Sequence, residues 1–305
     1  MFLELPEVGK TEWWRYVIGF LLVLFFWFVL GSVGPVLLAI FSMIDGNPDT
    51  FLLSTGFVSG IDPMINFVVV NVSFITLMAG LVITVVIVHG RPFRTLITPF
   101  KQINWRRIAQ GFTVYLLLVT LTSGVEFVMN PEIYMFTLNW QRFVPFALLI
   151  LIFTPIQTSA EELFFRGYLL QACGHILKNP VGLIVINGIL FMLPHLANPE
   201  VASGPVLLAL YYFGIGAFFA FVTLRDNGLE LAIGAHAANN MYAAVFANYT
   251  DSVLPTDSIF TVTELDPVFG LVSFVVIAIL FYVTLLRDSR DAVSQIEFQE
   301  KAAND

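Results

Sequence analysis

Long apolar stretches separated by short polar segments dominate the pattern along this chain. A helix needs about 20 consecutive apolar residues to cross a bilayer. Eight stretches meet or approach that length, at roughly 16–43, 65–88, 108–129, 143–177, 181–197, 205–224, 229–247 and 268–286. The pattern therefore predicts an all-α polytopic membrane helix bundle with about eight transmembrane helices. Because no internal repeat or low-complexity linker is visible, residues 1–305 are expected to form a single integral membrane domain.

Composition supports this class. Hydrophobic residues make up 58% of the chain and charged residues 12%, whereas a soluble domain has about 25% charged residues. All but one of the 14 Lys and Arg residues fall on one side if the N-terminus is inside, and the exception is Arg142. Basic residues accumulate on the cytoplasmic side of membrane proteins. We therefore expect cytoplasmic N- and C-termini, in what is most simply a prokaryotic cell membrane.

The net charge of −8 arises largely from the loops expected on the outer side. The acidic residues of these loops are Asp45, Asp49, Asp62, Asp251, Asp257, Glu264 and Asp266. This is an ordinary outer-loop composition and does not indicate a basic partner. The basic loop 90–107 is interpreted as a topology signal that contacts the phosphates of the lipid bilayer, so no nucleic-acid partner is expected.

Two adjacent carboxylates, Glu161 and Glu162, interrupt the fourth apolar stretch together with Arg166. Ionisable groups at membrane depth are costly and usually mark function. Adjacent helical residues point about 100° apart, so the two glutamates cannot share one role. Arg166 follows Glu162 by four residues, the spacing of a helical ion pair. Glu162 and Arg166 are therefore assigned a supporting role, and Glu161, left without an in-helix partner, is the candidate general base. The alternative is a solvated helix end at the cytoplasmic interface.

The depth of Glu161 can be compared with that of His195 by counting from the hinge Lys178-Asn179-Pro180. At the helical rise, Glu161 lies roughly 25 Å before the hinge and His195 roughly 22 Å after it. A helical hairpin would thus bring them to similar depth. A lone His in an apolar helix is more often structural, but this match favours a functional residue. Counting from the other end of the stretch places Glu161 nearer the cytoplasm, and a break at Pro155 would reconcile the two counts.

His236 and Asn240 are four residues apart and share one face of a helix rich in Ala and Gly. Such small residues also let helices approach closely, which would give this stretch a plain packing role. Asn239 is expected to point elsewhere and to be structural.

Glu161, His195, His236 and Asn240 form a possible hydrolytic set. Glu161 and His195 would polarise a water as general base, and His236 and Asn240 would donate to an oxyanion. No cofactor is expected in this reading. A zinc ion held by Glu161, His195 and His236 is the alternative, although no local metal motif supports it. No sequence typical of a nucleotide-binding loop is present.

Three motifs carry a resemblance to a known family. Glu161-Glu162-x-x-x-Arg166, Phe191-x-x-x-His195 and His236-x-x-x-Asn240 occur in that order on separate segments. They resemble the motifs of the CPBP family, also called the Abi or type II CAAX prenyl protease family of intramembrane glutamate-dependent proteases. The resemblance covers roughly residues 140–250, the expected catalytic core. It implies an eight-span helical fold and glutamate-dependent peptide hydrolysis. In the eukaryotic branch the reaction removes the last three residues of prenylated proteins, while prokaryotic members are also linked to bacteriocin immunity.

The leading hypothesis is an intramembrane endopeptidase that hydrolyses a peptide bond of a membrane-associated protein or peptide, reached from the membrane or the cytoplasmic face. One alternative is a non-catalytic membrane adaptor or bacteriocin-immunity-type protein that keeps the polar set as structural glue. A second is a small proton-coupled transporter, since carboxylates and histidines within membranes also carry protons. Inverted repeats would favour the transporter, and none is evident.

Overall fold

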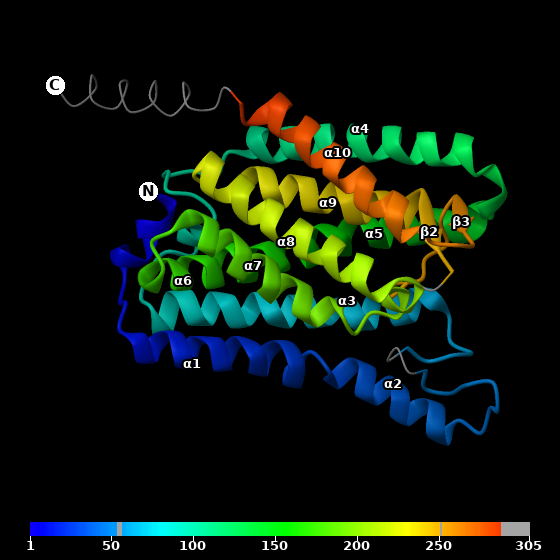
Figure 1. Cartoon of the computed structure of the whole chain (residues 1–305). Helices are drawn as coiled ribbons and strands as arrows, with labels where there is room; N and C mark the ends of the chain where they lie inside the picture. Colours follow the sequence, from blue (N-terminus) through cyan, green and yellow to red (C-terminus); the bar gives the residue numbers. More distant parts are fainter. Residues whose placement is uncertain (54–56, 251, 288–305) are drawn as a thin grey trace.

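The computed structural model describes residues 1–53, 57–250 and 252–287. These residues form a bundle of roughly parallel helices, with the N-terminus at one end and a small sheet at the other (Figure 1). The helices are α1 (Trp13–Leu24), α2 (Val33–Ile44), α3 (Pro63–Ile83), α4 (Trp105–Met129), α5 (Trp140–Glu162), α6 (Leu170–Ile176), α7 (Pro180–His195), α8 (Pro205–Asp226), α9 (Glu230–Val245) and α10 (Pro267–Leu285). The predicted all-α membrane bundle is confirmed.

Each of the eight apolar stretches contains helix. Within the described residues, six helical segments are long and apolar enough to span a membrane, and α7 is a shorter apolar helix. Helices α7 and α9 have 16 residues each, fewer than the roughly 20 that a span requires. Of the charged residues used to assign the topology, Asp251, Arg290 and Lys301 lie outside the described residues.

Polar caps explain where several helices begin. Asp62, Asn179 and Asp266 each accept backbone N–H groups at the first turn of α3, α7 and α10, and a proline follows each of them. This combination satisfies N–H groups that the helix itself leaves free, and it presets the first helical dihedral angle. The hinge between α6 and α7 is therefore where the sequence predicted it.

The predicted break at Pro155 is wrong. Helix α5 runs without interruption from Trp140 to Glu162 through both Pro145 and Pro155. The Thr158 hydroxyl donates to the carbonyl of Thr154 at 2.9 Å, within the turn that contains Pro155. Side chains and neighbouring helices of this kind let membrane helices tolerate proline. The departure from α-helical geometry comes later, in the wide turns of Leu163–Leu169.

The sheet was not predicted from the sequence. Strands β1 (Tyr134–Phe136), β2 (Ala247–Tyr249) and β3 (Phe260–Val262) have three residues each and lie in the order β1-β3-β2. Strand β3 pairs antiparallel with β1 and parallel with β2. The sheet joins the loop before α5 to the loop after α9 at the end of the bundle opposite the N-terminus (Figure 1).

The buried face of α9 packs directly against α4. A Cβ added at Gly234 would lie 2.0 Å from the carbonyl oxygen of Ile108, and one at Gly111 would lie 2.4 Å from the carbonyl oxygen of Leu231. Small residues permit this close approach of two backbones. Because α9 also carries His236 and Asn240, this contact sets the position of both side chains.

We expect Gly234→Ala to destabilise the protein, because the added methyl group meets backbone atoms that cannot rotate away. The loss should be about 1–3 kcal/mol in the free energy of unfolding. Gly124→Ala is the matched control on α4, because nothing lies within 4 Å of its added Cβ. Unfolding in detergent, followed by circular dichroism, measures both. Equal stability of the two variants would contradict the close contact between α4 and α9.

Candidate active site

The two glutamates occupy the last turn of α5 and are both buried. Glu161 is 6% exposed, and Glu162 and Arg166 are 0% exposed. Arg166 lies in the wide, π-type turns of Leu163–Leu169 that continue α5. Turns of this type inside a helix often occur at functional sites.

Glu162 forms the centre of a buried charged cluster. Its Oε1 accepts from Arg166 Nη1 at 2.7 Å and from His236 Nδ1 at 2.7 Å. The predicted pair between Glu162 and Arg166 is thus confirmed, and its extension to His236 on α9 is a contact that the sequence did not reveal. A carboxylate only accepts hydrogen bonds, so it fixes the proton of His236 on Nδ1.

Arg166 connects this cluster to two further helices. Its Nη2 donates to the carbonyl oxygen of Gly216 on α8 at 3.2 Å. Its guanidinium carbon lies 4.2 Å from the centre of the Phe191 ring on α7. Elements α5, α7, α8 and α9 therefore meet around one ion pair, which orients the neighbouring side chains.

Glu161 faces His236 from the other side. The Glu161 Oε2 and His236 Nε2 atoms are 3.7 Å apart, which is longer than a direct hydrogen bond and lets both atoms contact one water. Gln157, one turn earlier on α5, is a polar neighbour of Glu161 and lines the same cavity. It carries no charge, so it does not pair with Glu161 as Arg166 pairs with Glu162.

His195 is held rigidly at the end of α7. Its Nδ1 lies 2.7 Å from the carbonyl oxygen of Phe191, so Nδ1 donates and Nε2 is left free to accept. The ring lies between Phe191 and Tyr212, with centroid distances of 4.4 and 4.6 Å. The sequence placed His195 and Glu161 at similar depth, and the two residues do line the same cavity.

This cavity, which we call the histidine cavity, has a volume of about 150 Å³. It is lined by the four candidate catalytic residues, Glu161, His195, His236 and Asn240. A water occupies roughly 30 Å³ in the liquid, so there is room for a water and a small part of a substrate. The sequence thus identified residues that the fold does bring together.

Asn239 differs from its expectation. It lines the histidine cavity as well, and its Nδ2 donates to Asn240 Oδ1 at 3.0 Å. The prediction that Asn239 points elsewhere was wrong, because the cavity extends around this face of α9. The contact occupies the oxygen of Asn240 and leaves its N–H groups available to a ligand.

The structure does not arrange the alternative zinc set as a metal site. Among the described residues, no group of three or more His, Cys, Asp or Glu side chains could hold a metal ion. Glu161, His195 and His236 therefore do not form a ligand set in this geometry. The Nδ1 atoms of His195 and His236 instead bond to the Phe191 carbonyl and to Glu162.

Sequence reasoning missed three residues at the sheet end of the cavity. Glu200 is 4% exposed and accepts from Asn198 Nδ2 at 3.0 Å and from the Tyr212 hydroxyl. All three residues line the histidine cavity. The sequence did offer one signal for these residues, because Glu200 is a carboxylate in the short segment directly after the helix that carries His195.

The cavity is also lined by Asn248 on β2 and by Leu254 in the segment between β2 and β3. It therefore reaches the end of the bundle that carries the small sheet.

Comparison with known proteins gives two matches. A family model described as Rce1-like, type II CAAX prenyl endopeptidase, matches residues 140–242. The chain is also 39% identical over 264 residues to a Bacillus subtilis (strain 168) protein that carries the name Uncharacterized protein YyaK. That similarity covers 86% of this chain and 87% of the Bacillus protein. No solved structure matches the chain.

We expect Arg166→Met to destabilise the protein strongly, because it leaves the buried Glu162 carboxylate without its cation. Removing one partner of a buried ion pair costs about 3–5 kcal/mol. Arg142→Met is the control, since Arg142 pairs with Asp62 and Asp257 while its side chain is 37% exposed. Exposed pairs contribute about 1 kcal/mol or less. Similar losses of unfolding free energy in detergent would show that Glu162 does not depend on Arg166.

Proposed function

The chain belongs to the Rce1-like type II CAAX prenyl endopeptidase family, and on this premise we propose that it is an intramembrane endopeptidase. It is an integral membrane protein of the CAAX-protease-like kind. In our proposal it hydrolyses a peptide bond of a membrane-associated protein or peptide, using a water activated by Glu161 and histidine. The observation that supports this most directly is the approach of Glu161 Oε2 to His236 Nε2 within the histidine cavity.

The nucleophilic water is proposed to lie between Glu161 and His236. Glu161 accepts a proton as the water oxygen attacks the peptide carbonyl carbon. His236 holds the same water through Nε2, because its Nδ1 already donates to Glu162. This differs from the role first expected for His236, which required a proton on Nε2 for donation to an oxyanion.

Asn240 is proposed to stabilise the oxyanion that forms on the attacked carbonyl. Its amide oxygen is occupied by Asn239, so its N–H groups can donate into the histidine cavity. His195 lies on the same cavity with Nε2 as an acceptor and is proposed to assist proton transfer. The proton taken by Glu161 then passes to the amide nitrogen as the C–N bond breaks, which yields an amine and a carboxylic acid that keeps the second proton of the water.

We expect Glu161→Gln to abolish peptide hydrolysis and to leave folding in the membrane intact. The amide keeps the shape of the side chain and removes the base. Purified protein in nanodiscs, incubated with a library of internally quenched peptides, provides the measurement. Glu12→Gln is the control, because Glu12 is an exposed carboxylate at the N-terminal end of the bundle, opposite the small sheet. Turnover by Glu161→Gln near that of the wild type would rule out the proposed base.

A second prediction separates an enzyme from a non-catalytic adaptor. Loss of an oxyanion donor typically lowers turnover by ~10²–10³-fold. Asn240→Ala should therefore reduce kcat strongly, change KM little and leave the thermal unfolding temperature close to that of the wild type.

Asn239→Ala should give a smaller decrease in kcat, since Asn239 only orients Asn240. Asn71→Ala is a better inert control, because the buried Asn71 lies on α3 and lines neither described cavity. An adaptor would instead show reduced stability or partner binding in Asn240→Ala, with no turnover to lose.

A further inference from the structure

A second cavity, which we call the tyrosine cavity, lies beside the histidine cavity. It has a volume of about 160 Å³ and is surrounded by α4, α8, α9 and α10 near the small sheet. Six tyrosines line it: Tyr115, Tyr134, Tyr211, Tyr212, Tyr242 and Tyr249. The mechanism proposed above does not use this space.

The two cavities share a wall. Glu200, Tyr211, Tyr212, Asn239, Ala243 and Tyr249 line both of them. Asn239 contacts Asn240, the candidate oxyanion donor, on the histidine-cavity side. The side chain of Asn239 would therefore lie between a group bound in the tyrosine cavity and Asn240, in the site proposed to hold the scissile peptide bond.

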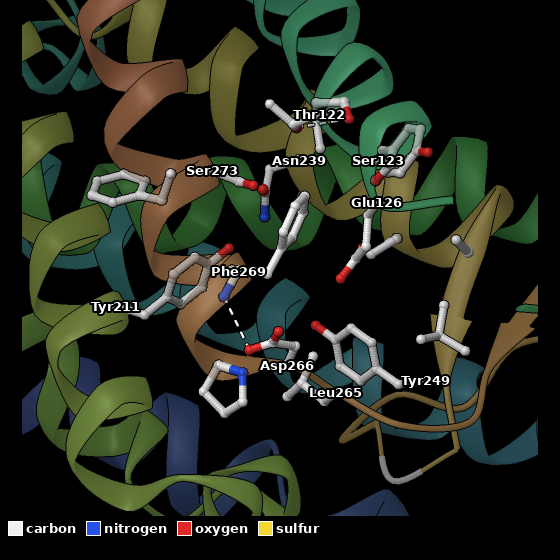
Figure 2. Close-up of a pocket in the computed structure, with 18 of the residues that line it drawn as sticks. Thr122, Ser123, Glu126, Tyr211, Asn239, Tyr249, Leu265, Asp266, Phe269 and Ser273 are labelled. Atoms are coloured by element: carbon white, nitrogen blue, oxygen red, sulfur yellow. Dashed lines mark hydrogen bonds between the residues drawn. The ribbon is translucent and has the colours of Figure 1, made fainter. Parts of the chain in front are cut away.

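The tyrosine cavity is acidic. Glu126, Glu200 and Asp266 line it, and the described residues of its lining include no Lys, Arg or His. Glu126 and Asp266 are close enough to interact electrostatically. Figure 2 shows the carboxylates of Glu126 and Asp266 directed into the same space as the hydroxyls of Tyr211 and Tyr249. Glu200 is buried, Glu126 is half-buried and Asp266 is exposed at the edge of the cavity. Three carboxylates gathered around one cavity favour a ligand of positive charge.

Two of these carboxylates have protein partners that use only part of their capacity. Glu126 Oε2 accepts from the Tyr134 hydroxyl at 2.7 Å. Asp266 Oδ1 accepts from the backbone N–H groups of Val268 and Phe269 at 2.9 and 3.0 Å, and so caps α10. Within the part of the chain that the structure describes, the second oxygen of each carboxylate accepts no protein hydrogen bond, and a carboxylate can accept several bonds.

Glu200 gives an independent indication of a missing donor. It is 4% exposed, and both of its protein donors, Asn198 and Tyr212, bond to Oε1. The other oxygen, Oε2, is buried and has no hydrogen-bond partner among the residues that the structure describes. A buried carboxylate oxygen left unsatisfied is costly, so a ligand donor at the shared wall would relieve that cost.

The aromatic rings add a second attraction for the same kind of ligand. Tyr211, Tyr249 and Phe269 surround the space into which the carboxylates point (Figure 2). The face of an aromatic ring attracts an ammonium or guanidinium group, most strongly where water is excluded. An anionic or purely aliphatic group would gain nothing from the three carboxylates.

We propose that the tyrosine cavity is a substrate subsite that binds a basic side chain, lysine or arginine, next to the peptide bond held in the histidine cavity. This rests on the proposed endopeptidase function, because it names the class of peptide that the site accepts. Glu126 and Asp266 supply the charge, Glu200 accepts from the cation at the shared wall, and the aromatic rings enclose the aliphatic part of the side chain.

A binding experiment tests the charge preference without requiring turnover. Wild-type protein in zwitterionic nanodiscs is titrated with n-butylguanidinium and with its neutral analogue n-butylurea, and binding is followed by saturation-transfer NMR of the probe. We expect n-butylguanidinium to bind at least about tenfold more tightly. The double variant Glu126→Gln/Asp266→Asn should lose about 10–100-fold in guanidinium affinity, as expected for lost hydrogen bonds to charged groups.

The substitutions keep hydrogen-bond acceptors for Tyr134 and for the first turn of α10, which protects the fold. Glu132→Gln is the matched control, because Glu132 is an exposed carboxylate near the same end that lines neither cavity. It should bind n-butylguanidinium as the wild type does. Equal binding of the charged and neutral probes by the wild type, or unchanged binding by the double variant, would overturn the proposal.

An activity measurement then tests the position of the subsite. Quenched peptides carry arginine, lysine or neutral citrulline at each position flanking the cleaved bond, and one set carries only a free N-terminal amine. At one position we expect kcat/KM to be at least about tenfold higher for arginine than for citrulline. In the double variant this ratio should approach one, because the arginine peptide loses the charge that favoured it.

The outcomes separate the two proposals. A preference for the free amine alone would refute a side-chain subsite, as would cleavage with no preference for arginine at any position. If the wild type cleaves no peptide but binds n-butylguanidinium selectively, the endopeptidase proposal and the subsite role fail while the cavity's charge selectivity stands. If cleavage depends on Glu161 and the probe does not bind, only the subsite proposal fails.

Discussion

The buried contact between Glu162 and Arg166 is the constraint on which the rest of the site depends. Two charges at 0% exposure are tolerable only when each is paired and hydrogen-bonded. Here one carboxylate oxygen receives both the guanidinium and the imidazole of His236. The guanidinium in turn reaches a carbonyl on α8 and an aromatic ring on α7. A cluster of this kind orients four helices at once, because none of its members can move without leaving a buried charge unpaired.

This cluster gives the adjacent glutamates different surroundings. Glu162 is enclosed and bonds to His236, whereas Glu161 lines a cavity and faces the second nitrogen of the same ring. The imidazole thus lies between one carboxylate that fixes its proton and another that can share a water with it. The arrangement requires the close packing of α9 on α4, where Gly234 and Gly111 allow the backbones to touch. The position of the imidazole and its proton therefore depends on the packing of α9 against α4.

The two cavities lie between this charged cluster and the small sheet. Their common wall carries Glu200 and the aromatic residues Tyr211, Tyr212 and Tyr249, so polar and aromatic groups meet where a substrate would pass. The wall is formed by α8, α9 and the loops that follow α7 and α9. The loops at this end differ in character from the opposite end, where Arg107 pairs with Asp226 and bonds to the carbonyl oxygen of Leu285. An ion pair thus joins α4 to α8 at one end of the bundle, and the two cavities lie toward the other end.

The sequence by itself determined the membrane class, the positions of the eight helical segments, the hinge before Pro180 and the three motifs that carry the candidate residues. Bilayer thickness and helical rise act along one dimension, so hydrophobic runs and residue counts are sufficient for these features. One of two competing counts placed Glu161 and His195 at similar depth, and both residues line the same cavity. The i,i+4 pair of Glu162 and Arg166 was predictable because both residues lie on one helix.

Contacts between helices were decided only by the tertiary structure. The bond from His236 to Glu162 joins residues 74 positions apart, and it depends on how α9 is rotated against α5. The same rotation turns Asn239 toward the cavity, and loop placement brings in Glu200. Pro155 was misjudged because its local cost is offset by neighbours that no local pattern reveals. The rotation and crossing angle of each helix arise from packing among all the segments. The pattern along one segment therefore determines which residues share a face, but it does not determine which helix or loop that face contacts.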